Sequence, residues 1–396
     1  MKIVHVMPWY MPKMGYQENY LPLEQKKLGH DIEIITADRY YPFPSFEKTV
    51  GHILGNRVIG SGIFFDNEIK IHRLPIQFEI KSYSQFLLKG LKEKLRELKP
   101  DIIHAHGVFT PSTLQTIFYI RKSNYQLVID DHCHDNNFNQ NSILIKTYLE
   151  VVKLFYKVYG KNISHFLPVT YSSKNIIQSI LQIPEKNITL LHLGVDANVF
   201  KKSKELRKNC RKELNIKDNE VLFISTGKFT QNKDIDILIE AFKNIAKIYS
   251  NTKLLLVGNG PAEYMKYLTD LIDDLSIKEK VIFHDFVINT DLPKFYNAAD
   301  IGIWPGDHTI TAIEATATGL PVIIPSYNAA YSILFNNKSA LGFERASINS
   351  LFEKISMFIQ DKKIRENIST NALRLVETEL SWEKIARKSI EIYLAD

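Results

Sequence analysis

The chain has 396 residues, of which 45% are hydrophobic and 24% charged. This length exceeds one ordinary core and predicts two α/β domains, and the composition is that of a globular protein. The net charge of +6 lies wholly in residues 1–190, which hold 23 Lys and Arg against 17 Asp and Glu. The excess indicates either an anionic partner, such as a phosphate-bearing acceptor or an acidic membrane surface, or a lysine-rich genome. No nucleic-acid partner is expected.

Three features of the sequence predict a cytoplasmic protein. No run of about 18 apolar residues is present, so we expect no membrane-spanning helix. The first ten residues resemble a strand rather than a signal peptide. Cys133 and Cys210 are too few for a disulfide framework and suit a reducing compartment.

Apolar β-branched runs alternate with helical runs, a pattern typical of parallel sheets with crossover helices. In the first half we expect strands within 2–7, 28–38, 68–75, 101–107, 126–135, 165–170 and 188–196. Helices are expected at 18–28, 84–98 and from Pro111 onward. The first domain is therefore predicted to span residues 1–190.

The same alternation restarts in the second half. We expect strands within 221–229, 252–261, 280–287, 301–305 and 320–325. Helices are expected at 234–246, 262–275 and from about 309. This pattern predicts a second domain at 191–380. A last helix within 381–396 has no strand after it and can pack across onto the first domain.

The segment 303–325 holds the most informative motif. A strand is followed by a short polar loop and then by a helix with Glu314 near its start. The free N–H groups of such a helix start suit a pyrophosphate, and Glu314 can reach a ribose hydroxyl. An acid near a helix start is also what the helix dipole alone favours.

This motif resembles the hallmark of glycosyltransferase family 4, which has the GT-B fold. Glu314-Ala315 and Gly-Leu-Pro-Val at 319–322 match its second part. The family's first glutamate, eight positions earlier, is replaced here by Gly306, and the nearest acid is Asp307. In the family this acid lies by the donor sugar, so the resemblance makes Asp307 the candidate substitute.

Further motifs of the second half match the same family in order. In 225–242, Lys228 stands for the usual arginine and Lys233 matches the lysine, so the resemblance implies that both hold the donor diphosphate. The alternative is two solvated loop lysines. The remaining donor-site candidates implied by the family pattern are Gly258, Phe286, Val287, Thr309, Thr311 and Ala312.

The first half resembles the family more loosely. Gly15 remains from a paired glycine in the opening loop, where a backbone N–H would approach the donor phosphates, although it can equally be a turn residue. His132 is the candidate for the family's histidine beside the transferred sugar, with His134 as the competitor. Asp, His and Cys make up the whole of 130–135, but no second cluster with ligand spacing follows, so no metal is predicted.

Two basic stretches, 84–99 and 143–161, combine apolar residues with lysines. Such helices can lie at an anionic membrane surface, although ordinary domain helices have the same pattern. We expect peripheral contact with the inner face of the cell membrane as one interpretation.

The resemblance implies a GT-B fold: two Rossmann-like, doubly wound domains that face each other across a cleft. It implies retaining transfer of a hexose from a UDP- or GDP-sugar to a hydroxyl on a glycan or lipid-linked glycan, with no cofactor. The proposed catalytic residues are His132, Lys233, Asp307 and Glu314. Two alternatives stay open: a nucleotide-sugar 2-epimerase and a catalytically inactive scaffold subunit.

Overall fold

A computed structural model describes residues 1–396 apart from 44–45, 81–84, 134–141, 308, 328–330 and 396. The chain divides into two compact units. Unit 1 consists of Met1–Gly194 together with Trp382–Asp396, and unit 2 is the continuous segment Val195–Ser381. The join therefore lies four residues beyond the expected position, and the C-terminal helix belongs to the first unit rather than forming a separate part. Among the described residues, no helix has both the length and the apolar character that a membrane span requires.

Unit 1 is built on a seven-stranded sheet with the order β3-β4-β2-β1-β7-β8-β9, in which only β3 is antiparallel. Its strands are β1 (Lys2–Val6), β2 (Asp31–Ala37), β3 (Gly62–Asp66), β4 (Ile69–Leu74), β7 (Ile102–His106), β8 (Gln126–Asp131) and β9 (Ile163–Pro168). A separate hairpin pairs β5 (Ile76–Ile80) with β6 (Gln85–Leu88). The central strands are buried on both faces, because helices cover them, and this explains their uninterrupted apolar sequences.

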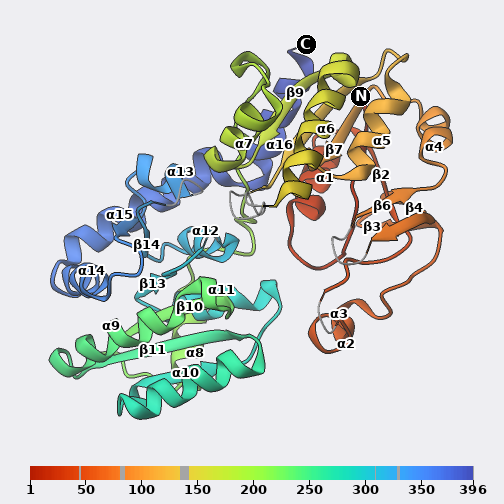
Figure 1. Cartoon of the computed structure of the whole chain (residues 1–396). Helices are drawn as coiled ribbons and strands as arrows, with labels where there is room; N and C mark the ends of the chain where they lie inside the picture. The colour runs from red at the N-terminus through yellow and green to blue at the C-terminus, as the bar shows by residue number, and fades with distance from the viewer. Residues whose placement is uncertain (44–45, 81–84, 134–141, 308, 328–330, 396) are drawn as a thin grey trace. The chain divides into compact units, whose positions relative to one another are not determined.

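The helices of unit 1 are α1 (Gln17–Lys27), α2 (Phe46–Thr49), α3 (Gly51–Leu54), α4 (Leu91–Leu98), α5 (Pro111–Ile120), α6 (Ile143–Tyr159), α7 (Tyr171–Leu181) and α16 (Trp382–Leu394). The last helix packs against α1, to which it is joined by a hydrogen bond from Gln25 to Ser389 and by stacking of Tyr20 on Trp382 (Figure 1). Residues from the two ends of the chain therefore share one core.

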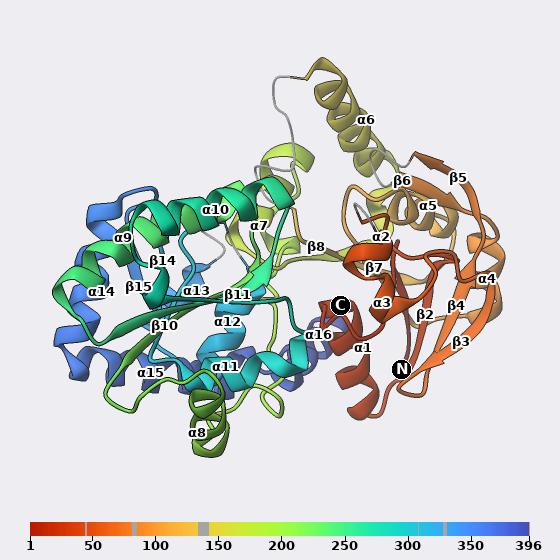
Figure 2. The ribbon, with the colours of Figure 1, turned by 90° about the horizontal axis from the view of Figure 1, so that it is seen from below.

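Unit 2 contains a six-stranded sheet with the order β12-β11-β10-β13-β14-β15, and every pairing is parallel. Its strands are β10 (Val221–Lys228), β11 (Thr252–Asn259), β12 (Val281–His284), β13 (Ile301–Ile303), β14 (Val322–Pro325) and β15 (Leu341–Phe343). Its helices are α8 (Lys204–Glu213), α9 (Ile235–Ile248), α10 (Ala262–Asp274), α11 (Leu292–Ala298), α12 (Ile310–Ala317), α13 (Ser332–Asn336), α14 (Ile348–Gln360) and α15 (Lys362–Leu375). Figure 2 shows β10 and β11 side by side. Both units thus have the doubly wound α/β architecture expected from the sequence.

Two expected elements differ from the structure. The expected helix at 84–98 is not one helix, because its described part contains both β6 and α4. Gly90, with φ of 81°, changes the direction of the backbone between them, and α4 starts only at Leu91. The stretch 188–196 is not a strand, because only Ile188 and Val195 make isolated bridges. Short apolar runs fit strand and helix patterns equally well, and tertiary pairing decides between them.

The chain passes between the units at Gly194 and again at Ser381, and these two passages lie together. Val195 pairs with Ser381 within unit 2, and its N–H donates to the Leu380 carbonyl at 2.7 Å. Within unit 1, Gly194 lies so close to the Trp382 ring that a Cβ at position 194 would stand 2.6 Å from it.

We expect Gly194→Ala to destabilise the protein by about 1–3 kcal/mol, because the added methyl group overpacks the buried Trp382 ring. Thermal denaturation followed by circular dichroism measures this loss. Gly160→Ala is the matched control, since its Cβ would meet the flexible end of Ile163 at 3.2 Å and make an ordinary contact with Tyr156 at 3.8 Å. An equal loss in both variants would contradict the explanation.

Candidate functional site

The candidate site in unit 2 begins where β10 and β11 end with their backbones in close approach. Gly258, with φ of 152°, lies against the Gly227 carbonyl, and a Cβ at position 258 would collide with that oxygen. Lys228 follows at the end of β10 and is exposed. The glycine predicted at 258 is therefore needed to bring the loop after β11 beside the loop that carries Lys228.

The loop after β13 packs onto the turn that precedes α9. The Lys233 ammonium donates to the Asp307 carbonyl at 3.0 Å. Burial lowers the pKa of Lys233, so its charge is poorly solvated in the free protein. Together with Lys228, Gly227 and Thr309, these residues line one small pocket. An anion that binds in this pocket would interact strongly with the Lys233 ammonium, because little water competes for that charge.

Gly306 explains the departure from the family pattern. A Cβ at this position would collide with the backbone of Asn232 and Lys233. A glutamate at 306 therefore requires the turn at 232–233 to move. In this chain the Lys233 turn takes the space that a side chain at 306 would need.

Asp307 does not present a free carboxylate in the structure. One of its oxygens pairs with Arg345 at 3.1 Å, and the other accepts a hydrogen bond from the Asn232 amide at 2.8 Å. Arg345 also pairs with Asp234 at 2.8 Å, so it joins the loop after β13 to the start of α9. In the free protein Asp307 is thus bound by the turn before α9 and by Arg345 after β15. Its contact with a donor sugar stays a prediction.

Arg345 is the site residue that sequence reasoning missed. It follows β15 by two residues, at the carboxyl end of a parallel strand, where doubly wound sheets place their binding residues. The Arg345 guanidinium also lies over the Tyr327 ring, 5.3 Å from its centroid, and this cation–π contact further restrains the Arg345 side chain. No strand was expected from the sequence after 320–325, so the strand-end position of Arg345 became visible only with β15 in the structure.

The start of α12 is held by hydroxyl groups. The Thr309 N–H donates to the Tyr331 hydroxyl at 3.0 Å, and the Thr309 and Thr311 hydroxyls lie 2.9 Å apart. Thr311 in turn donates to the Thr226 carbonyl at the end of β10. The structure thus directs the N-terminus of α12, with buried Ala312 behind it, toward the strand end that carries Lys228.

Glu314 is buried in unit 2, with 3% of its surface exposed. One carboxylate oxygen accepts from the Asn289 amide at 2.8 Å, and within the described residues the other oxygen has no hydrogen-bond partner. Burial raises the pKa of Glu314 to about 7. A ligand hydroxyl that donated to the second oxygen would relieve this cost.

The segment after β12 lies beside Glu314 through the same Asn289 contact. Phe286 is about half exposed and Val287 is partly buried. The structure thus brings together the lysine pocket and the α12 start, and it connects Glu314 to the segment that carries Phe286 and Val287.

The remaining candidates, Gly15 and His132, belong to unit 1. Gly15 has φ of 72°, a left-handed turn conformation just before α1. His132 follows β8 directly, with 37% of its side chain exposed, and its Nε2 lies 3.8 Å from Asp130. The competitor His134 lies outside the described residues.

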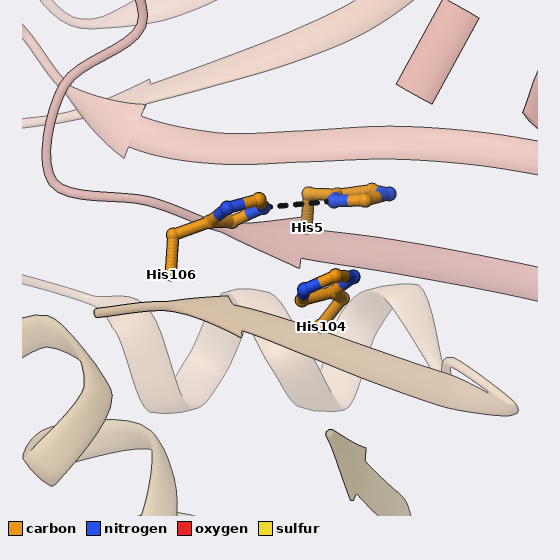
Figure 3. Close-up of side chains that lie close together, drawn as sticks. All are labelled: His5, His104 and His106. Carbon is orange, nitrogen blue, oxygen red and sulfur yellow. Dashed lines mark hydrogen bonds between the residues drawn. The ribbon is translucent and has the colours of Figure 1, made fainter. Parts of the chain in front are cut away.

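Three buried histidines, His5, His104 and His106, lie together on β1 and β7 (Figure 3). The His104 and His106 rings are stacked, with centroids 4.6 Å apart and planes within 2°. The nitrogens of His5 are occupied by His106 at 3.0 Å and Gln25 at 2.7 Å. Stacked rings do not direct their lone pairs at a common point, so among the described residues this cluster suits a hydrogen-bond network better than a metal ion.

Comparison with known proteins assigns the chain to a family. Residues 22–199 match the model described as Glycosyltransferase Family 4, and residues 207–375 match that described as Glycosyl transferases group 1. The chain is a GT-B glycosyltransferase of family 4. The fold and family expected from the sequence are therefore confirmed.

Relatives and solved structures agree with this assignment. An uncharacterized glycosyltransferase of Methanocaldococcus jannaschii is 25% identical over 92% of this chain and 90% of its own. The alpha-monoglucosyldiacylglycerol synthase of Acholeplasma laidlawii is 22% identical, with 96% of each chain covered. The crystal structure of Anabaena HepE in complex with UDP has a TM-score of 0.75 at 17% identity, with 100% of both chains covered, and thus shares the glycosyltransferase's fold.

The buried Glu314 predicts a pH dependence of stability. Its pKa is raised from 4.5 to about 7 on folding, so the folded state binds the extra proton and stability falls as pH rises from about 5 to 8. Glu314→Gln removes this term. Across this range the wild type should therefore lose up to about 3 kcal/mol more unfolding free energy than the variant. Melting temperatures measured over the same range should fall more steeply in the wild type. Parallel curves for the two proteins would disprove the assignment.

Proposed function

We propose that this glycosyltransferase transfers a hexose from a nucleotide-diphosphate sugar to a hydroxyl acceptor, with retention of configuration and without a metal. One observation carries the proposal: a buried carboxylate at Glu314 lacks a partner for one oxygen among the described residues, on the helix that starts at a lysine-lined pocket. This arrangement matches a ligand with hydroxyl groups at one end and a diphosphate at the other.

Each donor group has a proposed partner in unit 2. Lys228 and Lys233 hold the diphosphate and stabilise it as the leaving group, aided by the N-terminus of α12. Glu314 accepts from the ribose hydroxyls. The backbone at Phe286 and Val287 faces the base.

Asp307 has a different proposed role from the one that the sequence suggested. Because Arg345 and Asn232 engage both of its carboxylate oxygens, we propose that Asp307 holds the Lys233 turn in place. His132 then remains the candidate for orienting the sugar. A retaining reaction of this kind needs no protein nucleophile if the donor phosphate accepts the proton of the acceptor hydroxyl.

The proposed acceptor is a glycan or a lipid-linked glycan. Similar proteins include the alpha-monoglucosyldiacylglycerol synthase of Acholeplasma laidlawii and a GDP-mannose-dependent alpha-(1-6)-phosphatidylinositol monomannoside mannosyltransferase of Mycobacterium tuberculosis. The latter is 22% identical over 54% of this chain and 57% of its own. The names of these two relatives support a lipid-linked acceptor at a membrane. The donor base is proposed to be uracil or guanine.

Helix α6 supports peripheral contact with a membrane on the cytoplasmic side. Figure 2 shows it at the edge of unit 1. Five large aliphatic side chains of this helix are at least half exposed: Ile143, Leu144, Val151, Leu154 and Val158. Exposed lysines flank this stripe at positions 146, 157 and 161. An apolar stripe beside a basic row is the arrangement of a helix that lies in an anionic interface.

The other basic stretch, 84–99, does not offer such a surface. Leu88, Leu91, Leu95 and Leu98 are buried in the core of unit 1. Four of the five leucines in this stretch are therefore core residues, and Leu87 alone among them is exposed. Of the two stretches, α6 is the one that supports the interpretation.

Donor binding should stabilise the protein. A nucleotide-sugar at about 100 times its dissociation constant should add about 2.7 kcal/mol, visible as a rise in melting temperature across a panel of UDP-, GDP- and ADP-sugars. In Lys233→Ala, most of the rise in melting temperature caused by the diphosphate should disappear. Lys243 is an exposed lysine on α9, and Lys243→Ala should show the same rise as the wild type. No rise with any nucleotide would contradict the proposed donor site and favour an inactive scaffold.

Membrane contact is tested by sedimentation with vesicles of phosphatidylglycerol and phosphatidylcholine. The double variant Leu144→Asp, Leu154→Asp should bind at least about tenfold more weakly, because two aliphatic groups no longer enter the interface. Phe65→Asp is the matched control, since Phe65 is an equally exposed apolar residue on β3. Equal binding by all three proteins would exclude α6 as the contact.

A further inference from the structure

The carboxylate of Asp130 lies at the end of β8 and is completely buried. Its Oδ2 atom accepts from the Gln17 amide at 2.8 Å and lies 2.7 Å from His106 Nδ1 and 3.3 Å from His104 Nε2. Its Oδ1 atom accepts from the Gly107 N–H at 3.2 Å. Side chains or backbone from α1, β7 and the turn after β7 therefore converge on one carboxylate.

A buried carboxylate that stays ionised requires a positive charge close by. His106 is the nearest imidazole, 2.7 Å from the carboxylate, but only 3% of its surface is exposed. His5 and His104 are also poor sources, because burial lowers the pKa of both imidazoles. His132 differs, since its Nε2 is buried beside Asp130 while 37% of its side chain is exposed. Water can therefore solvate part of an imidazolium at this position and at none of the fully buried histidines.

We propose that Asp130 is a positioning residue that keeps His132 doubly protonated, so that its ring acts as a hydrogen-bond donor to the donor sugar and not as a base. The inference rests on the proposed function for the sugar contact alone. The charge pairing itself is a property of unit 1 without any ligand.

The charges around His132 support this assignment. Burial lowers the pKa of His132, but the Asp130 carboxylate acts in the opposite direction and raises it to about 9. Glu18 on α1 and Asp131 on β8 act in the same direction, and His104 acts in the opposite one. Asp131 is the weaker partner, because its two oxygens accept the backbone N–H groups of Val108 and Cys133 and burial raises its own pKa to about 6.

The role of His132 follows from its protonation. A doubly protonated imidazole has no lone pair with which to remove a proton from the acceptor hydroxyl. It can donate to a sugar hydroxyl or to a developing negative charge. Because Nε2 faces Asp130, the opposite edge of the ring is the one available to a ligand.

Histidine NMR on the ligand-free protein tests the pairing directly. The signal of His132, assigned by its loss in His132→Gln, should titrate near pH 9 in the wild type. In Asp130→Asn it should titrate at or below about 6.5. Asp131→Asn is the matched control and should move it by less. Titration of His132 near 6.5 in the wild type, or equal shifts in the two variants, would overturn the proposal, and the wild-type titration decides even if Asp130→Asn does not fold.

The pH profile of transfer tests the functional role. In Asp130→Asn, kcat/KM should fall about tenfold per pH unit above the new pKa of His132, whereas the wild type should hold its rate up to about pH 8.5. Identical profiles would overturn the positioning role. A failure of the proposed function is distinguishable, because it would abolish transfer in every variant and leave the NMR titrations unchanged.

Discussion

The candidate site of unit 2 depends on a steric constraint, the close approach of backbone segments where side chains are excluded. Gly258 lets the ends of β10 and β11 meet, and Gly306 lets the loop after β13 rest on the turn at 232–233. These two approaches place the Lys233 ammonium against the Asp307 carbonyl and bring Arg345 within reach of both acidic residues that it pairs. The cationic pocket is thus a consequence of backbone packing as much as of the lysines themselves.

The two buried carboxylates show how environment assigns different roles to similar groups. Glu314 has one amide donor and no cation among its described hydrogen-bond and ion-pair partners, so burial raises its pKa and leaves an oxygen for a ligand. Asp130 is equally buried, yet histidines and an amide surround it and hold its pKa well below the usual range. Glu314 thus keeps one oxygen without a partner among the described residues, whereas both oxygens of Asp130 are engaged within unit 1.

Much of the fold could be predicted from the sequence, because buried parallel strands and amphipathic helices leave local patterns. The doubly wound sheets and the positions of Lys233 and Glu314 at strand ends or helix starts were accessible in this way. Arg345 and the Asp130 network were not, since their partners are distant in sequence and only tertiary packing brings them together. Local chemistry identified Asp307 as an acid in the right loop, but not that Arg345 and Asn232 would occupy it.

The assignment of α16 to unit 1 has a consequence for synthesis on the ribosome. Tyr393 and Ser389, which follow the whole of unit 2 in the chain, contact Gln25 in the core of unit 1. Unit 2 is one continuous segment and needs nothing that follows Ser381. Domains commonly mature in the order in which they are translated. Here unit 1 cannot complete its core until α16 has been made, whereas unit 2, which precedes α16, can close its core earlier.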